Sequence, residues 1–149
     1  MSSNALTLPA MHTVFQVIAA ARSLEKAAAR VFKPHGLTPA RFNVLNLLSE
    51  EPAGMRASDL ASALIVDPSN VTGLLKRMKK EGLLAEMENA SDRRQYIVGL
   101  SAKGRRAWRD AHRDYERCLA ALIGRLTGAE CAAADRVLQT LIEEAANIP

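Results

Sequence analysis

The stretch that decides the fold runs from Arg56 to Ser101 and reads RASDLASALIVDPSNVTGLLKRMKKEGLLAEMENASDRRQYIVGLS. Its pattern predicts a short helix, a turn, an amphipathic helix and then two short strands joined by a charged turn. The amphipathic helix opens at Asp67 or Ser69 and runs to about Glu81. Its apolar side chains recur at positions i, i+3, i+4 and i+7, which predicts a buried stripe of Val71, Leu74, Leu75 and Met78.

The opposite face of this helix has short polar side chains near its start and cations further along. A helix of this kind can enter a DNA major groove with its N-terminal end first, where Asn reads adenine and Lys or Arg takes guanine or phosphate. A glycine inside a helix costs roughly 1 kcal/mol relative to Ala, so Gly73 suggests a close approach of backbone to another surface. The predicted reading face comprises Ser69, Asn70, Thr72, Gly73, Lys76 and Arg77.

Two strands are predicted after a stop at Gly82, at Leu84–Glu88 and Gln95–Leu100, with a turn between them. An arginine at a hairpin tip can insert into the narrow minor groove of A·T-rich DNA, where the potential is most negative. A carboxylate two residues away can hold that guanidinium in one geometry, so Asp92 is predicted to orient Arg94.

The residues on both sides of these elements predict further helices with caps that can be read directly. Ser58 is the predicted N-cap of the short third helix, with Leu60, Ala61 and Leu64 facing inward. The first helix is predicted from Pro9 to Phe32, and the second is capped by Thr38, has Pro39 at its first position and ends at Glu51. A long helix is capped by Ser101 and reaches about Leu126. The last helix opens with the capping box Thr127–Glu130 and ends at about Ala146.

Length and composition are those of one globular domain. The chain has 149 residues and 48% apolar residues, which excludes a disordered chain. It lacks a basic start followed by an apolar run, and no stretch approaches the ~20 apolar residues that span a bilayer. Two cysteines 13 residues apart form neither a disulfide framework nor a zinc pattern. We therefore expect a soluble, cytoplasmic protein with no membrane partner.

Positive charge is concentrated around the amphipathic helix and the predicted hairpin. Residues 67–106 contain nine cations and five anions, a net charge of +4, which equals the net charge of the whole chain. The remaining residues carry 11 cations and 11 anions and are neutral overall. Localised positive charge of this kind is typical of a surface that binds a polyanion.

Taken in order, several segments resemble the MarR family of bacterial winged-helix transcription regulators. The resemblance covers nearly the whole chain, from about Pro9 to the last helix. Its motifs are weak individually and strong in this order and spacing. They are GLTPARFNVL at 36–45, DLA at 59–61, SNVTGLLKRMKKEGL at 69–83, DRR at 92–94 and LSAKGR at 100–105.

The resemblance implies a mainly α fold with a small β-hairpin wing, that is, a winged helix-turn-helix whose terminal helices form a dimerisation domain. Residues 1–36 and 102–149 would form the dimerisation region, and residues 37–101 the DNA-binding lobe, in a single intertwined domain. It also implies a homodimer that binds double-stranded DNA at a pseudo-palindromic operator. The DNA-binding residues it implies are Ser58, Pro68, Ser69, Asn70, Thr72, Gly73, Lys76, Arg77, Asp92, Arg93 and Arg94.

Many members of this family bind small aromatic acids or phenols between the dimer helices and the winged lobe. The resemblance therefore implies a repressor that such an effector releases from its operator by favouring an unsuitable lobe spacing. Candidate residues of the effector site form no recognisable motif. They are His12, Phe15, Arg22, His35, Phe42, Trp108 and His112.

Two alternatives stay open at this point, and one turn departs from the family pattern. Cys118 and Cys131 permit a thiol-redox-sensing regulator of the same fold, since Cys131 lies early in a helix. The acidic strand with Glu86 and Glu88 stands where relatives are often basic, so a helical interaction module that has lost DNA binding is also possible. Ile65 stands where relatives often have Gly, which puts the geometry of the turn in doubt.

An enzyme is the least supported class. The sequence has no nucleophile–base set, no paired carboxylates with a cleft signature and no glycine loop that cradles phosphate. Three scattered histidines and two cysteines have no ligand spacing. We therefore expect no catalytic residues, no metal site and no cofactor.

Overall fold

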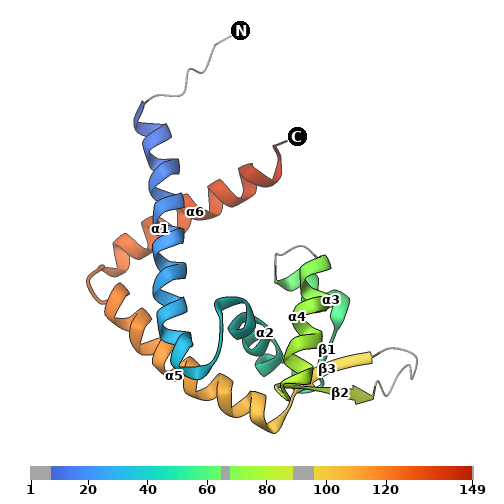
Figure 1. Ribbon diagram of the computed structural model, residues 1–149. Coiled ribbons are helices and arrows are strands. Elements are labelled where there is room, and N and C mark those ends of the chain that lie inside the picture. Colours follow the sequence, from blue (N-terminus) through green and yellow to red (C-terminus); the bar gives the residue numbers. More distant parts are fainter. Residues whose placement is uncertain (1–7, 65–67, 89–95, 149) are drawn as a thin grey trace. The chain divides into compact units, whose positions relative to one another are not determined.

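The computed structural model of the protein describes residues 8–64, 68–88 and 96–148 (Figure 1). By its contacts the chain divides into two compact units, Met1–Tyr115 and Glu116–Pro149. Its elements are α1 (Leu8–Phe32), the 3-10 turn η1 (Lys33–His35), α2 (Pro39–Glu50), β1 (Met55–Arg56), α3 (Ala57–Ala63), α4 (Pro68–Lys80), β2 (Leu84–Glu88), β3 (Tyr96–Leu100), α5 (Ala102–Ile123) and α6 (Gly128–Ala146). The mainly α fold with a small antiparallel sheet confirms the predicted fold class.

The helix ends of α1 and α2 follow from the residues that predicted them. The η1 turn closes on Gly36, whose φ of 67° lies in the left-handed region that glycine adopts without strain. Thr38 caps α2 and its hydroxyl accepts a hydrogen bond from the Arg41 N–H at 3.3 Å. Pro39 occupies the first helical position, where the missing N–H costs nothing.

The start of α3 corrects the sequence-based expectation. Ser58 is not the N-cap, because the helix begins at Ala57 and the extended residue before it is Arg56. The Ser58 hydroxyl instead donates to the Asp59 carboxylate at 3.3 Å. The physical reason is strand β1, which pairs with β3 up to Arg56 and keeps the backbone extended until the helix starts.

The sheet has three strands rather than the two predicted, in the order β1-β3-β2, and all pairs are antiparallel. The central strand β3 pairs Val98 with both Met55 and Glu86. Strand β1 is only two residues long, so it has no alternation that a sequence could reveal. The predicted first residue of the last strand, Gln95, lies outside the described residues.

The hydrophobic core of the first unit joins α1, α2, α3, α4 and the sheet. Of the stripe predicted on α4, Val71, Leu75 and Met78 are buried and Leu74 is partly buried. The rings of Phe32 and Phe42 stack with centroids 4.2 Å apart, which joins α1 to α2. Burying the stripe on this side turns the polar face of α4 to the surface.

The turn after α4 is held against the start of α5. The Ser101 hydroxyl donates to the Gly82 carbonyl at 2.6 Å and accepts from the Gly104 N–H at 2.9 Å, as the predicted cap requires. Lys103 Nζ donates to the Glu81 carbonyl at 2.7 Å. At its other end α5 stops at Ile123, three residues before the predicted end, because Gly124 is a poor helix former.

Helix α6 opens with the predicted capping box. The Thr127 hydroxyl accepts from the Glu130 N–H, and the Glu130 carboxylate accepts from the Thr127 N–H at 2.8 Å. Cysteines 118 and 131 are free thiols that are partly buried. Among the described residues, no helix combines the length and the apolar composition needed to cross a membrane.

The capping box predicts a pH dependence of α6. The pKa of Glu130 is lowered, first by the hydrogen bond from the Thr127 backbone and then by that from its side chain. Because the folded-state pKa is depressed, the stabilising contribution is present at neutral pH and is lost as the pH falls through that lowered value. Thr127→Ala should move the Glu130 pKa back toward its ordinary value in an NMR titration. An unchanged titration curve would contradict this assignment.

Candidate nucleic-acid interface

Helix α4 presents a polar face to the surface, opposite its buried stripe. Asn70, Thr72, Lys76 and Arg77 are all exposed. Pro68 and Ser69 form its first residues, as the sequence predicted for the end that would enter a groove. Hydrogen-bonding side chains thus lie near the N-terminal end, and the cations follow toward the C-terminal end. This arrangement suits reading of bases at one end and phosphate contacts at the other.

Gly73 lies on the same face and has open space around it. Among the described residues, no atom beyond its own helix turns lies within 4 Å of the point where a Cβ would stand. Packing within the chain therefore does not require a glycine at this position. The close approach of an external surface to this backbone stays a prediction, which the open space permits.

Gly73→Ala should separate folding from binding. Ala is favoured over Gly inside a helix by up to about 1 kcal/mol, so the melting temperature should rise by roughly 2–4 °C. The added methyl group should at the same time weaken DNA binding if the backbone approaches the groove closely. Calorimetry and a fluorescence-anisotropy titration on the same preparation measure the two effects, and unchanged DNA affinity would contradict close approach.

The predicted wing is described only at its base. Strands β2 and β3 pair from Leu84–Leu100 to Glu88–Tyr96 and bring their ends to the hairpin. Asp92, Arg93 and Arg94 lie outside the described residues, and so does Ile65. Their roles remain predictions, as does the DNA contact that the family resemblance implies for Ser58, which is exposed in the first turn of α3.

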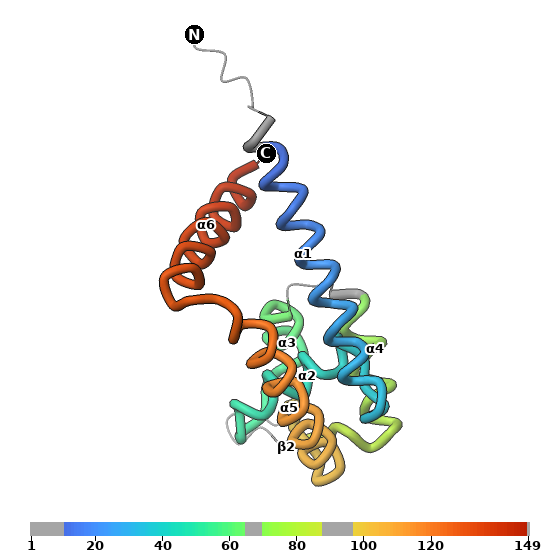
Figure 2. The backbone as a smooth tube through the Cα atoms, turned by 90° about the vertical axis from the view of Figure 1, so that its left-hand side faces the viewer, coloured from blue at the N-terminus to red at the C-terminus, as the bar shows by residue number. Residues whose placement is uncertain are grey.

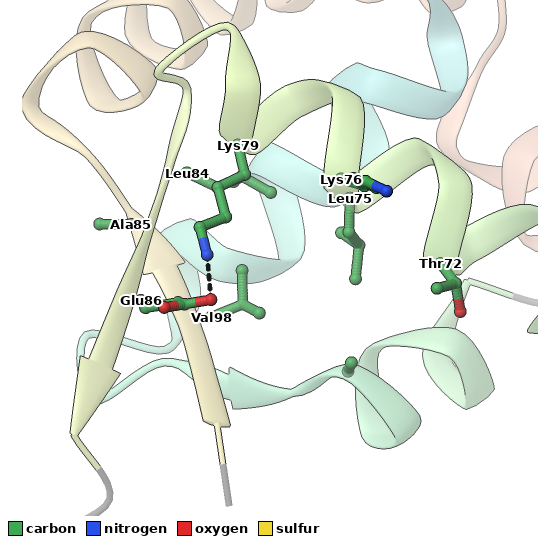
Figure 3. A pocket seen from close by; sticks show the side chains of 9 residues that line it. Thr72, Leu75, Lys76, Lys79, Leu84, Ala85, Glu86 and Val98 are labelled. Carbon is green, nitrogen blue, oxygen red and sulfur yellow. Dashed lines mark hydrogen bonds and ion pairs between the residues drawn. The ribbon is translucent and has the colours of Figure 1, made fainter.

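The acidic strand β2 has an ion-pair partner that the sequence did not reveal. Lys79 on α4 donates to the Glu86 carboxylate, and Figure 3 shows the two side chains pointing toward each other between helix and strand. The negative charge of Glu86 is therefore paired with a neighbouring cation. A second ion pair holds the C-terminal end of α4, since Arg41 donates two hydrogen bonds to Glu81 at 2.9 and 2.6 Å.

A cavity of about 260 Å³ lies between α4 and the sheet (Figure 3). Its walls are mostly apolar, and the Lys79–Glu86 pair is part of its lining. No pattern in the sequence predicted it, because it is formed by residues from four separate elements. The lining residues are Ala57, Thr72, Leu75, Lys76, Lys79, Leu84, Ala85, Glu86 and Val98.

Only part of the predicted effector site comes together. Phe42 on α2 and Trp108 and His112 on α5 form one aromatic cluster, in which the Trp108 and His112 rings stack at 5.0 Å and the Phe42 and His112 rings lie 6.4 Å apart. The Trp108 indole N–H donates to Asn46 Oδ1 at 3.1 Å. His35 contacts Asp114 at 3.0 Å, across 79 residues of sequence. Neither Asn46 nor Asp114 was predicted, since each is an isolated polar residue on a helix.

The other predicted effector residues lie elsewhere on α1. His12 contacts Gln16 at 3.2 Å, and His12, Phe15 and Arg22 are all exposed. Within the described ranges, no group of three or more His, Cys, Asp or Glu residues could hold a metal ion.

Comparison with known proteins identifies the family. The MarR family profile matches residues 37–96, from two residues before α2 to the first residue of β3. The transcriptional activatory protein BadR of Rhodopseudomonas palustris is 35% identical over 96 residues, which is 63% of this chain and 55% of BadR. The homoprotocatechuate degradative operon repressor of Escherichia coli is 32% identical over 96 residues, or 61% of this chain and 64% of that protein. The chain thus spans between half and two thirds of the length of these relatives.

Solved structures extend the likeness to almost the full chain. AbsC of Streptomyces coelicolor, a MarR-family regulator, has a TM-score of 0.87 at 24% identity and covers 98% of this chain and 100% of its own. The transcriptional regulator MosR of M. tuberculosis, solved in complex with DNA, has a TM-score of 0.70 at 27% identity and covers 91% of this chain and 98% of its own. Residues 37–96 thus match the MarR family of winged helix-turn-helix transcription regulators, and the likeness to AbsC shows that the fold continues over almost the whole chain.

Proposed function

We propose that the protein is a sequence-specific DNA-binding transcription regulator. The observation that carries this is α4, whose buried stripe leaves Asn70, Thr72, Lys76 and Arg77 exposed on one face. MosR supports the proposal, because it is similar over 91% of this chain and was solved with DNA. Family membership argues against an enzyme, since MarR proteins are regulators of transcription.

In this proposal the residues of α4 divide between base and phosphate contacts. Asn70 and Thr72, near the N-terminal end, contact base edges, and Lys76 follows one turn later. Arg77 lies beside the groove and takes a phosphate. Ser69 and Gly73 complete the reading face, and Pro68 begins the helix.

The proposed active form is a homodimer in which residues 1–36 and 102–149 form the shared helical region. Large apolar side chains are exposed on α1, α5 and α6, and water contact with so many of them is unfavourable. A second copy would bury them and bring two DNA-binding lobes to a two-fold symmetric operator. These side chains are Met11, Val14, Phe15, Ile18, Leu24, Leu122, Ile123, Val137, Leu138 and Ile142.

We further propose that the protein is a repressor released by a small aromatic or phenolic acid. The relative from Escherichia coli is named as a repressor of a homoprotocatechuate degradative operon, and this chain has an aromatic cluster at Phe42, Trp108 and His112. A panel of aromatic acids at millimolar concentration should raise the melting temperature and weaken operator binding. A panel that changes neither would remove the effector from the proposal.

The decisive experiment is in vitro selection of bound DNA with the full chain. Selected sequences should contain an inverted repeat, whose half-site spacing reports the dimer. Affinity for the selected DNA should fall steeply with salt as counterions are released. Selection that enriches no sequence, together with binding that salt does not affect, would support the alternative of an interaction module without DNA binding.

Arg94→Ala should weaken operator binding, mainly through the A·T-rich flanks. An arginine inserted in a narrow minor groove reads its negative potential rather than individual bases. Gel-shift titrations with A·T-rich and G·C-rich flanks should show the larger loss on the first DNA. Arg93→Ala removes the same charge one residue away and serves as the comparison, and equal affinities for wild type and Arg94→Ala would overturn the wing assignment.

A further inference from the structure

The Lys79–Glu86 pair joins the C-terminal half of α4 to the strand that leads to the hairpin (Figure 3). We propose that this pair is a brace which fixes the angle between α4 and the wing, and that it thereby sets how strongly binding depends on the DNA flanks. The effect of the brace on DNA binding rests on the proposed function. The effect of the brace on the position of β2 can be measured in the free protein and does not depend on that function.

The packing between helix and strand explains why a brace is needed. Leu75 on α4 and Leu84 at the start of β2 are buried and hold the near end of the strand. Both also line the cavity of about 260 Å³ between α4 and the sheet, so the helix-facing side of β2 is not closely packed against α4 after Leu84. Glu86 follows Leu84 by two residues and therefore points to the same side of β2, toward the helix. The ion pair spans the region that apolar contacts leave open.

The charges around the cavity favour this reading over a free DNA contact. Its charged lining residues are Lys76, Lys79 and Glu86. Lys79 is engaged by Glu86, although both side chains keep about half of their surface exposed, at 51% and 47%. Lys76 is exposed and has no ion-pair partner among the described residues, so it stays available for DNA. This ion pair explains why an acidic residue, Glu86, stands on a strand that would face DNA: it holds the Lys79 side chain.

A change in the angle between α4 and β2 at Glu86 would also move the far end of the strand. The ladder from Leu84 to Glu88 pairs β2 with β3 along its whole length, so the two strands move together, and the sequence between them contains the predicted wing residue Arg94. A wing held at one angle reaches the flanking minor groove without first losing conformational freedom. Breaking the brace should therefore affect binding to the flanks more than binding by α4 itself.

The test is a double-mutant cycle on Lys79→Gln and Glu86→Gln, with the charge swap Lys79→Glu plus Glu86→Lys as rescue. Each single substitution should weaken binding to an operator with A·T-rich flanks by about two- to fivefold, the range expected for an exposed ion pair. The double variant should be no weaker than the single variants, and the swap should restore affinity. On DNA trimmed to the half-sites, the differences should be smaller.

Amide hydrogen exchange of β2 in the free protein tests the brace without DNA. Exchange at Ala85–Met87 should be faster in both single variants and return to the wild-type rate in the swap. Asp110→Asn on α5 adds the same charge as Glu86→Gln, and is the matched control that should change neither readout. If wild type selects no DNA, the proposed function fails while the exchange rates still decide whether the brace exists.

Two results would overturn the proposal. A simple charge effect would make Glu86→Gln bind DNA more tightly and Lys79→Gln more weakly, with additive effects in the double variant. Unchanged exchange of β2 in all variants would show that the strand is held without the ion pair. The swap separates a brace from a general folding defect, because restored exchange and affinity cannot arise from a damaged fold.

Discussion

Gly104→Ala is expected to destabilise the protein by about 2–3 kcal/mol, the upper part of the range for forcing an extra methyl group into a packed site. A Cβ at this position would lie 2.0 Å from the Leu83 carbonyl oxygen, which is far inside contact distance. The backbone turn that carries this oxygen is tied to α5 by the Ser101 hydrogen bonds, so it cannot simply move away. The melting temperature should fall by roughly 4–12 °C.

Gly73→Ala is the matched control, since it makes the same chemical change inside a helix with open space around it. Calorimetry should find opposite signs for the two variants. If Gly104→Ala were as stable as wild type, the close approach of α5 to the turn after α4 would be wrong. The placement of the wing relative to the long helix would then need revision.

Asn70→Ala is expected to relax specificity at particular base pairs, and to weaken binding to the preferred DNA by about 1–3 kcal/mol. This is the usual discrimination of a bidentate contact between an amide side chain and adenine. Asn70 is exposed in the first turn of α4, so its truncation should leave the melting temperature nearly unchanged. Repeating the in vitro selection with the variant measures which positions lose their preference.

Arg77→Ala provides the comparison for Asn70→Ala. A residue that contacts phosphate should weaken binding to all sequences alike and lower the salt dependence. If Asn70→Ala caused the same uniform loss, it would be a phosphate contact and the reading face of α4 would have to be reassigned.

The sequence predicted those parts of the fold that local patterns encode. The stripe on α4, the cap at Thr38 and the capping box at Thr127 each lie within one turn or one helix, and all are present. The prediction that Ser58 caps α3 was wrong, because a serine before an apolar run is equally compatible with an N-cap and with the first turn of a helix. Only the pairing of β1 with β3 decided between them.

The candidate site also has one part that the structure describes and one part that depends on the sequence alone. Exposure of Asn70, Thr72, Lys76 and Arg77 follows from the burial of the opposite face, which the periodicity already implied. The proposed wing residues Asp92 to Arg94 depend on sequence alone, because they lie outside the described part of the structure.

The sequence by itself determined the helices, the last two strands and which face of α4 is exposed, because helical periodicity, strand alternation and capping are local properties of the chain. The tertiary structure decided which distant residues meet. Gly104 against Leu83, Lys79 with Glu86, and His35 with Asp114 are contacts that no local repeat encodes. They arise only when separate elements pack, since packing selects pairs by distance in space and not by spacing along the chain.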